Sequence, residues 1–99
     1  MTENQLIFCD TAFRQTVELN EILKEFGGCA AIEFRGLARE IEVWQMIFSK
    51  DAGKDFEFYK RNIFCLDEKP ESKWAICRIV EYLDNELKYW KNKKAHQEI

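Results

Sequence analysis

The residues that carry most enzymatic and metal chemistry are scarce in this sequence or badly placed. The chain has one histidine, His96, and its position beside the C-terminus would deny a catalytic dyad the fixed geometry that proton transfer requires. The four cysteines, Cys9, Cys29, Cys65 and Cys77, contain no closely spaced pair of the kind that binds zinc. Buried thiols are the simpler interpretation, with disulfides as the alternative. We therefore expect no catalytic residue, no metal site and no cofactor.

Glycine motifs and long apolar runs are also missing. Gly27-Gly28 and Gly53 do not form a phosphate-binding pattern. The sequence has no run of about 18 apolar residues that could span a membrane. Residues 1–5 lack the basic region that opens a signal peptide. These absences favour an intracellular, cytoplasmic protein with no membrane partner.

The composition is that of a small folded domain. Hydrophobic residues make up 46% of the 99 residues and charged residues 33%. The length fits one domain over residues 1–99, with residues 1–4 and 94–99 expected to fray. Eight Phe, three Trp and three Tyr supply bulky side chains that suit either a small core or an interface.

Charge is unevenly distributed along the chain. The net charge is −3, which argues weakly against general nucleic-acid binding. Residues 1–42 hold eight acids and four bases, whereas residues 87–95 hold four lysines and no acid. The sequence thus has an acidic first part and a basic end.

A helix is predicted over residues 12–26. The side chains of its inward face recur at helical spacing: Ala12, Thr16, Leu19, Leu23 and Phe26. Asp10 or Thr11 is a suitable N-cap, and the glycines at 27 and 28 are suitable for ending the helix. The short apolar run at residues 5–9 is either an N-terminal strand or a segment that only packs on the core.

Three strands are predicted in the middle of the chain. Residues 29–35 alternate between apolar and polar side chains, as a half-buried strand does. Residues 37–49 allow a helix by their spacing, but residues 41–48 are rich in branched and aromatic side chains, and we favour a strand. Residues 55–66 would form the second arm of a hairpin, with a bulge near Arg61-Asn62.

The last long segment, residues 71–91, organises the rest of the fold. Pro70 and neighbouring acids suit the entry to a helix. Its apolar side chains form one stripe that must be buried: Ile76, Val80, Leu83, Leu87 and Trp90. The predicted fold is α+β: a helix, a three-stranded antiparallel meander and a long C-terminal helix (αβββα), with both helices on one sheet face.

This order of elements resembles that of the double-stranded RNA-binding domain. That family places a basic cluster at the start of its last helix. Here the corresponding segment is Pro70-Glu71-Ser72-Lys73, with one base beside an acid. The resemblance is therefore limited to the order of elements and does not carry the function.

The second face of the predicted sheet directs our functional hypothesis. If 41–48 is a strand, Trp44, Met46 and Phe48 lie on the face that two helices cannot cover. We expect a small acidic non-enzymatic protein-interaction domain that forms a homodimer or binds a heterologous protein. Immunity proteins, inhibitors and viral or phage accessory proteins share its size, acidity and aromatic content. The candidate interface residues are Trp44, Met46, Phe48, Glu18, Glu21 and Glu25.

Two other functions are kept as alternatives. Nucleic acid could bind a basic cluster consisting of Lys88, Lys91, Lys93 and Lys94. The simpler interpretation of these lysines is that they complement the negative end of the helix dipole. An enzyme or small-ligand module on the uncovered sheet face has no recognisable motif.

Overall fold

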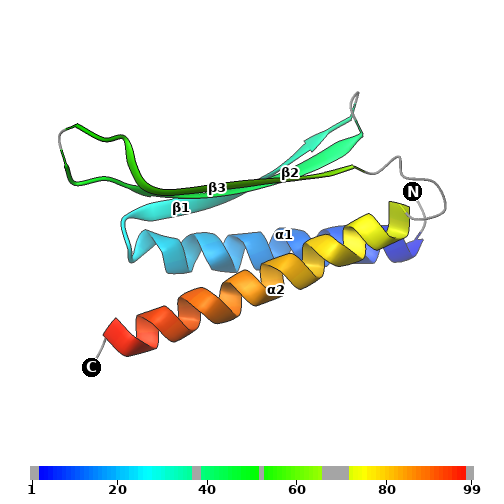
Figure 1. Ribbon diagram of the computed structural model, residues 1–99. Helices are drawn as coiled ribbons and strands as arrows, with labels where there is room; N and C mark the ends of the chain where they lie inside the picture. The colour runs from blue at the N-terminus through cyan, green and yellow to red at the C-terminus, as the bar shows by residue number, and fades with distance from the viewer. Residues whose placement is uncertain (1–2, 37–38, 52, 66–71, 98–99) are drawn as a thin grey trace.

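The predicted order of helices and strands is confirmed. The computed structural model describes residues 3–36, 39–51, 53–65 and 72–97, and side chains within 7–36, 39–51, 53–65 and 77–96 (Figure 1). The elements are α1 (Glu3–Lys24), β1 (Gly28–Arg35), β2 (Glu40–Phe48), β3 (Phe56–Cys65) and α2 (Ser72–Gln97). Pro70 and Glu71, at the expected entry to the last helix, lie outside the described residues.

Helix α1 starts earlier than expected, at Glu3, so residues 5–9 are helical and the suggested N-terminal strand does not form. The hydroxyl of Thr11 donates to the carbonyl of Ile7 across 3.0 Å, which is a bond made inside a helix and not at its cap. Cys9 packs against the core and carries the inward stripe one turn further upstream. A short apolar run is compatible with a strand and with a buried helix turn. Here the packing of Cys9 against the core favours the helix turn.

The turn between α1 and β1 depends on two adjacent glycines. Gly27 has a φ of 77°, in the left-handed region that glycine adopts at helix ends. At Gly28 a Cβ atom would lie 2.1 Å from the carbonyl oxygen of Met46, so β1 and β2 could not pair this closely with a side chain there. The expected glycine stop is therefore confirmed.

The three strands form an antiparallel sheet in the order β1-β2-β3. Residues 40–48 are a strand, as favoured, and Gln45 pairs with Ala30 on one side and Lys60 on the other. The register shifts between Ile47 and Phe48, and not near Arg61-Asn62 as expected. The bulge therefore lies at the hairpin end of β3 and leaves its later residues in regular pairing.

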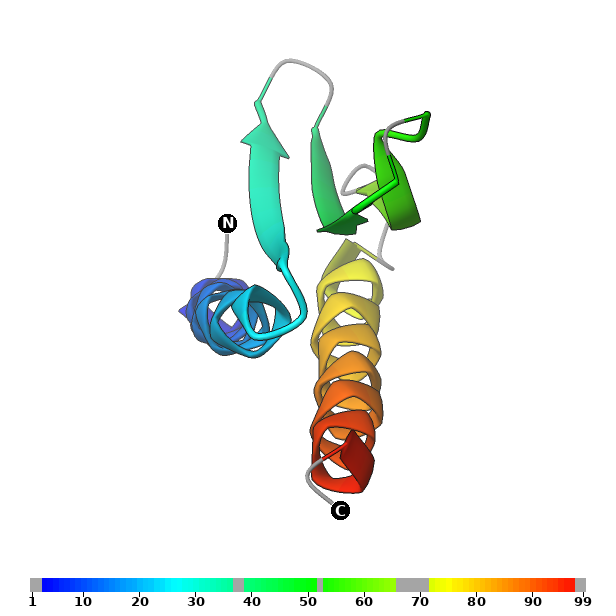
Figure 2. The ribbon, with the colours of Figure 1, turned by 90° about the vertical axis from the view of Figure 1, so that its left-hand side faces the viewer.

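Both helices cover the same face of the sheet (Figures 1 and 2). Helix α1 lies beneath β1, and α2 lies beneath β2 and β3 and slants away from the sheet toward its C-terminus. The Cα radius of gyration is 14.9 Å, against about 13 Å for a compact chain of this length. The extended shape is what a two-layer arrangement with one bare sheet face produces.

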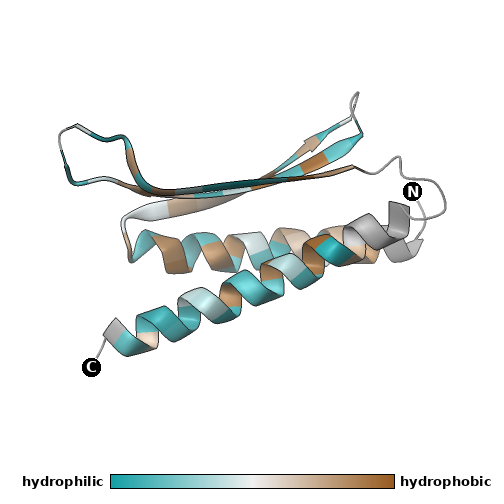
Figure 3. Cartoon of the chain, viewed as in Figure 1, coloured by the Kyte–Doolittle hydropathy of each residue, from teal (hydrophilic) through white to brown (hydrophobic). Residues whose placement is uncertain are grey.

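The core lies between the helices and the inner side of the sheet. Ile41, Val43 and Ile47 of β2 are buried there with the expected stripe residues Leu83, Leu87 and Trp90. Val80 packs at the margin of this core, and the side chain of Ile76 lies outside the described residues. Helix α2 runs on to Gln97 and so includes residues 94–97, which we expected to fray. Its C-terminal half is mostly hydrophilic (Figure 3).

Candidate interaction surfaces

The outer face of the sheet, which is turned away from both helices, carries the predicted interface residues of β2. Because side chains alternate along a strand, the burial of Val43 and Ile47 against the helices places Trp44, Met46 and Phe48 on the opposite side. Trp44 and Met46 are half-buried, and Phe48 is 52% exposed.

Residues of β3 enlarge this group into a surface that we call the outer apolar face. The ring centroids of Phe48 and Phe56 are 5.9 Å apart, and those of Phe56 and Tyr59 are 5.6 Å apart. Tyr59 and Ile63, both about half exposed, lie on the same side of β3. The outer apolar face comprises Trp44, Met46, Phe48, Phe56, Tyr59 and Ile63.

A cluster of charges lies on the same outer side and is paired within the chain, with Arg61 placed between Tyr59 and Ile63. The carboxylate of Glu42 is 5% exposed and makes ion pairs with Arg35 of β1 and Arg61 of β3. Nη2 of Arg61 also donates to Glu42 across 3.3 Å. The hydrogen bond to Glu42 raises the pKa of Arg61, so this guanidinium stays charged. The charges of this cluster satisfy one another and do not repel an approaching apolar surface.

The predicted acidic surface of α1 faces the basic end of α2. Glu18 makes an ion pair of 2.6 Å with Lys91, and Glu25 makes one of 2.7 Å with Lys94. Glu21 instead pairs with Lys24 on its own helix, at 3.0 Å. All three acids suggested as an interface therefore have partners inside the domain, two of them on the other helix.

The four lysines suggested as a nucleic-acid contact are divided among different partners. In addition to Lys91 and Lys94, Lys88 pairs with Asp84 across 3.0 Å. The ammonium of Lys93 lies 5.1 Å from the centroid of the Trp90 ring and 6.0 Å from that of Tyr89. The structure therefore offsets much of the positive charge that the sequence concentrates in this segment.

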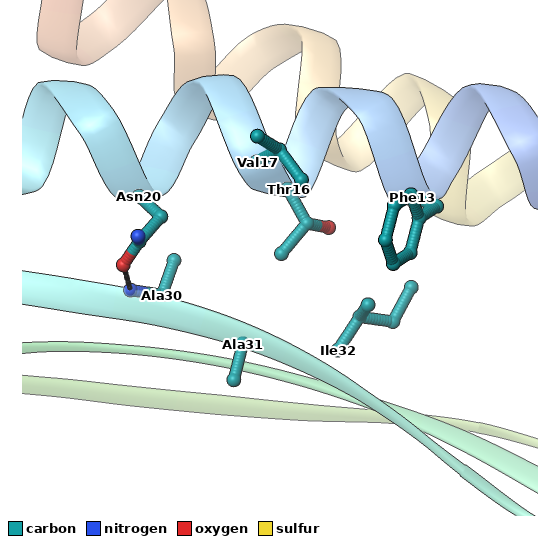
Figure 4. A pocket seen from close by; sticks show the side chains of 7 residues that line it. All are labelled: Phe13, Thr16, Val17, Asn20, Ala30, Ala31 and Ile32. Carbon is teal, nitrogen blue, oxygen red and sulfur yellow. Dashed lines mark hydrogen bonds between the residues drawn. The ribbon is translucent and has the colours of Figure 1, made fainter.

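A shallow hollow of about 240 Å³ lies between α1 and β1, at the β1 edge of the sheet (Figure 4). The side-chain oxygen of Asn20 crosses this gap and accepts a hydrogen bond of 3.0 Å from the amide of Ala30. The hollow is lined by Phe13, Thr16, Val17, Asn20, Ala30, Ala31 and Ile32. Its lining is mainly apolar, and its few polar groups are those of Thr16, Asn20 and the backbone. The hydroxyl of Thr16 already donates to the carbonyl of Ala12.

A second hollow of about 410 Å³ lies where α1 ends, beside the hairpin of β2 and β3. It is lined by Glu25, Phe26, Gly27, Ile47, Phe48, Lys50, Glu57 and Lys93. Charges of both signs lie around it, and Glu25 is engaged by Lys94. This arrangement does not select a ligand of one charge.

The residues with catalytic potential are not brought together in the described part of the chain. No group of three His, Cys, Asp or Glu side chains there could hold a metal ion. His96 is exposed, with its Nδ1 atom 2.8 Å from the carbonyl of Asn92. All four cysteines are half-buried and none of them forms a disulfide. Burial raises the pKa of Cys9, which disfavours the nucleophilic thiolate.

The sequence did not identify Phe56, Tyr59 and Ile63 as part of the interface candidate. Alternation in residues 55–60 predicted a strand, but the side that faces outward depends on the register with β2. The register shift beside Phe48 sets that orientation, and no sequence signal located it.

Comparison with known proteins identifies no relative. No known family model, curated protein or solved structure matches the chain. Among the described residues, neither helix is long and apolar enough to cross a membrane.

Proposed function

We propose that this chain is a small acidic non-enzymatic protein-interaction domain that self-associates through its outer apolar face. One observation carries the proposal: the helices cover one side of the sheet, and the other side presents clustered aromatic rings to solvent. Contiguous apolar surface of this kind typically marks an interaction site. Aromatic residues and methionine are the types enriched at protein interfaces.

A second copy of the chain suits this face for an electrostatic reason. The molecule carries a net charge of −3, so two copies repel at long range. On the outer side of the sheet, however, Glu42 is neutralised by Arg35 and Arg61. Two copies related by a twofold axis would thus meet through self-complementary surfaces whose charges are paired within each chain.

A heterologous protein that binds the same face would displace the second copy. This competition fits the inhibitor, immunity or viral accessory type that the size and composition suggest. In this proposal the domain acts in the cytoplasm as a binding protein, and its helices serve to hold the sheet in shape.

Sedimentation equilibrium over a range of concentrations tests the self-association. We expect the natural chain to associate, and Trp44→Ala or Phe48→Ser to weaken the association at least tenfold. Phe34→Ser is the matched control, because Phe34 is 61% exposed but lies on the helix side of the sheet. A natural chain that stays monomeric at every concentration, or equal effects of Phe34→Ser and Phe48→Ser, would contradict the proposal.

A further inference from the structure

The two edges of the sheet are protected differently. At the β1 edge, α1 lies alongside the strand, and Asn20 accepts the hydrogen bond of the outward-pointing Ala30 amide (Figure 4). At the β3 edge, α2 lies beneath the sheet and does not extend past the strand (Figure 2). Among the described residues, β3 is therefore the edge strand that no helix covers.

The pairing pattern shows which β3 backbone groups point to this edge. The amide of Phe48 donates to the carbonyl of Gly27, so the backbone groups of even-numbered β2 residues bond to β1. The amide of Ala30, an even-numbered residue of β1, points away from β2 and donates to Asn20, as this pattern requires. Because backbone groups alternate along an antiparallel ladder, the odd-numbered residues of β2 bond to β3 instead. Their partners in β3 are the even-numbered residues from 58 to 64. The amides and carbonyls of residues 59, 61 and 63 therefore point away from β2, to the edge.

The usual features that prevent edge pairing are weak in β3. Natural edge strands are kept apart by proline, by short length or by free lysine side chains. Strand β3 has ten residues and no proline. Its two bases are held by its own domain, since Lys60 pairs with Glu86 and Arg61 with Glu42. Both bases therefore already have an acidic partner within their own chain.

We propose that a second copy of the chain pairs antiparallel with the β3 edge, with the twofold axis at Arg61, to form one continuous six-stranded sheet. The regularly paired residues 58–64 are centred on Arg61, so this register uses all of them. Residues 59, 61 and 63 of each copy then exchange backbone hydrogen bonds with the other copy. The axis is perpendicular to the sheet, so all four helices stay on one side.

The side chains agree with this register. Tyr59 comes opposite Ile63 of the second copy on the outer side, and Phe58 comes opposite Phe64 of the second copy on the helix side. Tyr59 and Ile63 are 51% and 48% exposed in the single chain, so both gain burial. Cross-strand aromatic and branched pairs of this kind stabilise sheets. The two Arg61 side chains meet at the axis, each with its own Glu42 as a counter-charge.

The size of the outer apolar face gives a second reason for the edge pairing, separate from the backbone pattern and the side-chain pairs. This reason rests on the proposed function, because it assumes that two outer apolar faces meet. A face three strands wide and nine residues long measures about 14 by 30 Å, or about 400 Å². A stable interface commonly needs about 800 Å² from each partner. Edge pairing doubles the face and brings it to that size. Two six-stranded sheets meeting face to face would form a closed tetramer.

Proline substitution tests the edge pairing with little effect on the single chain. Tyr59→Pro removes an amide that points to the free edge, whereas the ladder to β2 is unchanged. We expect at least a tenfold weaker association by sedimentation equilibrium, with native far-ultraviolet circular dichroism. Because Tyr59 also belongs to the outer apolar face, Tyr59→Ser is the matched control, since it removes the ring and keeps the amide, and it should weaken the association less than Tyr59→Pro. Phe34→Pro, at the edge of β1, should associate normally. If Tyr59→Pro does not fold, Ile63→Pro removes a second amide that points to the free edge and should have the same effect.

Variants of the face and the edge separate the two proposals. We expect tetramers from the natural chain, edge dimers from Trp44→Glu and monomers from the double variant. Tyr59→Pro should give only weak face dimers, because a single face is below the usual size of a stable interface. If Trp44→Glu abolishes the association, and neither Tyr59→Pro nor Ile63→Pro changes it, the edge pairing is overturned and the proposed function stays intact. Dimers that Tyr59→Pro abolishes and that Trp44→Glu leaves unchanged would support the edge pairing and contradict the face contact.

Discussion

The indole Nε1–H of Trp90 donates a hydrogen bond of 3.0 Å to the side-chain oxygen of Gln45, between α2 and the centre of β2. The side-chain nitrogen of Gln45 donates in turn to the hydroxyl of Tyr82 across 2.9 Å. Gln45 and Trp90 are almost completely buried. This buried amide uses both its oxygen and its nitrogen to bond to α2, which fixes the position of the helix along the sheet more specifically than apolar contacts alone.

Replacing this amide should destabilise the domain. In Gln45→Leu the volume is nearly kept, but the Trp90 indole N–H loses its buried acceptor, which costs about 1–3 kcal/mol. Chemical denaturation should show this loss in the free energy of unfolding. The exposed Asn85→Ala on α2 is the control, with an expected change within about 0.5 kcal/mol. Equal stability of Gln45→Leu and the natural chain would show that the hydrogen bond is not required.

Tyr82 should make the stability depend on pH in the alkaline range. Burial first, and then the nearby Glu86 carboxylate, raise the pKa of Tyr82 from 10.0 to about 12. The folded protein therefore holds this proton more tightly than the unfolded chain, and stability falls as the pH rises from about 10 to about 12. Denaturation midpoints across this window should fall less in Tyr82→Phe. An identical pH dependence in both proteins would contradict the assignment.

The order of the elements could be read from periodicity because each helix has one long buried stripe. Leu83, Leu87 and Trp90 are spaced so that a helix alone brings them to one side, and they are buried together. The start of α1 could not be read in the same way. Thr11 is typical of a helix cap, but its hydroxyl donates to Ile7 within the helix. The helix continues upstream of Thr11, where Cys9 packs against the core.

The candidate site was only partly predictable for a related reason. Alternation in β2 placed Trp44, Met46 and Phe48 on one side, since a strand has only two sides. The contribution of β3 depends on a register shift that sequence periodicity does not reveal. The partners of the charged residues were also hidden, because Glu18 and Lys91 are distant in sequence and meet only when the helices pack.

The Glu42 cluster should contribute to stability despite its place at the sheet surface. The Glu42 carboxylate is nearly buried, and its two guanidinium partners are about 40% exposed. Glu42→Gln should therefore lower the free energy of unfolding by about 1–2 kcal/mol, less than for a fully buried pair. A double-mutant cycle with Arg61→Met should show that the effects of the two substitutions are not additive. Additive effects would show that Glu42 and Arg61 do not stabilise one another.

Gly28 should tolerate no side chain, for a reason specific to its strand. The Cβ of Gly28→Ala would meet the Met46 carbonyl oxygen at 2.1 Å, and a backbone atom cannot move aside without disturbing β2. We expect a loss of about 1–3 kcal/mol in thermal or chemical unfolding. Gly53→Ala is the matched control, because no atom lies within 4 Å of the added Cβ. Similar stabilities of the two variants would mean that β1 can shift relative to β2.

The basic end of α2 should not make the protein a nucleic-acid binder. Lys91 and Lys94 are engaged by acids of α1, and the whole molecule is negative. We expect no binding to duplex DNA or RNA in a fluorescence titration at low salt. Glu18→Gln combined with Glu25→Gln releases both lysines and should permit weak binding that falls steeply with salt. Salt-sensitive binding by the natural chain, lost when Lys88 and Lys93 are changed to Gln, would instead favour the nucleic-acid alternative. In that case α1 would act as an internal competitor for the lysines and not as their permanent partner.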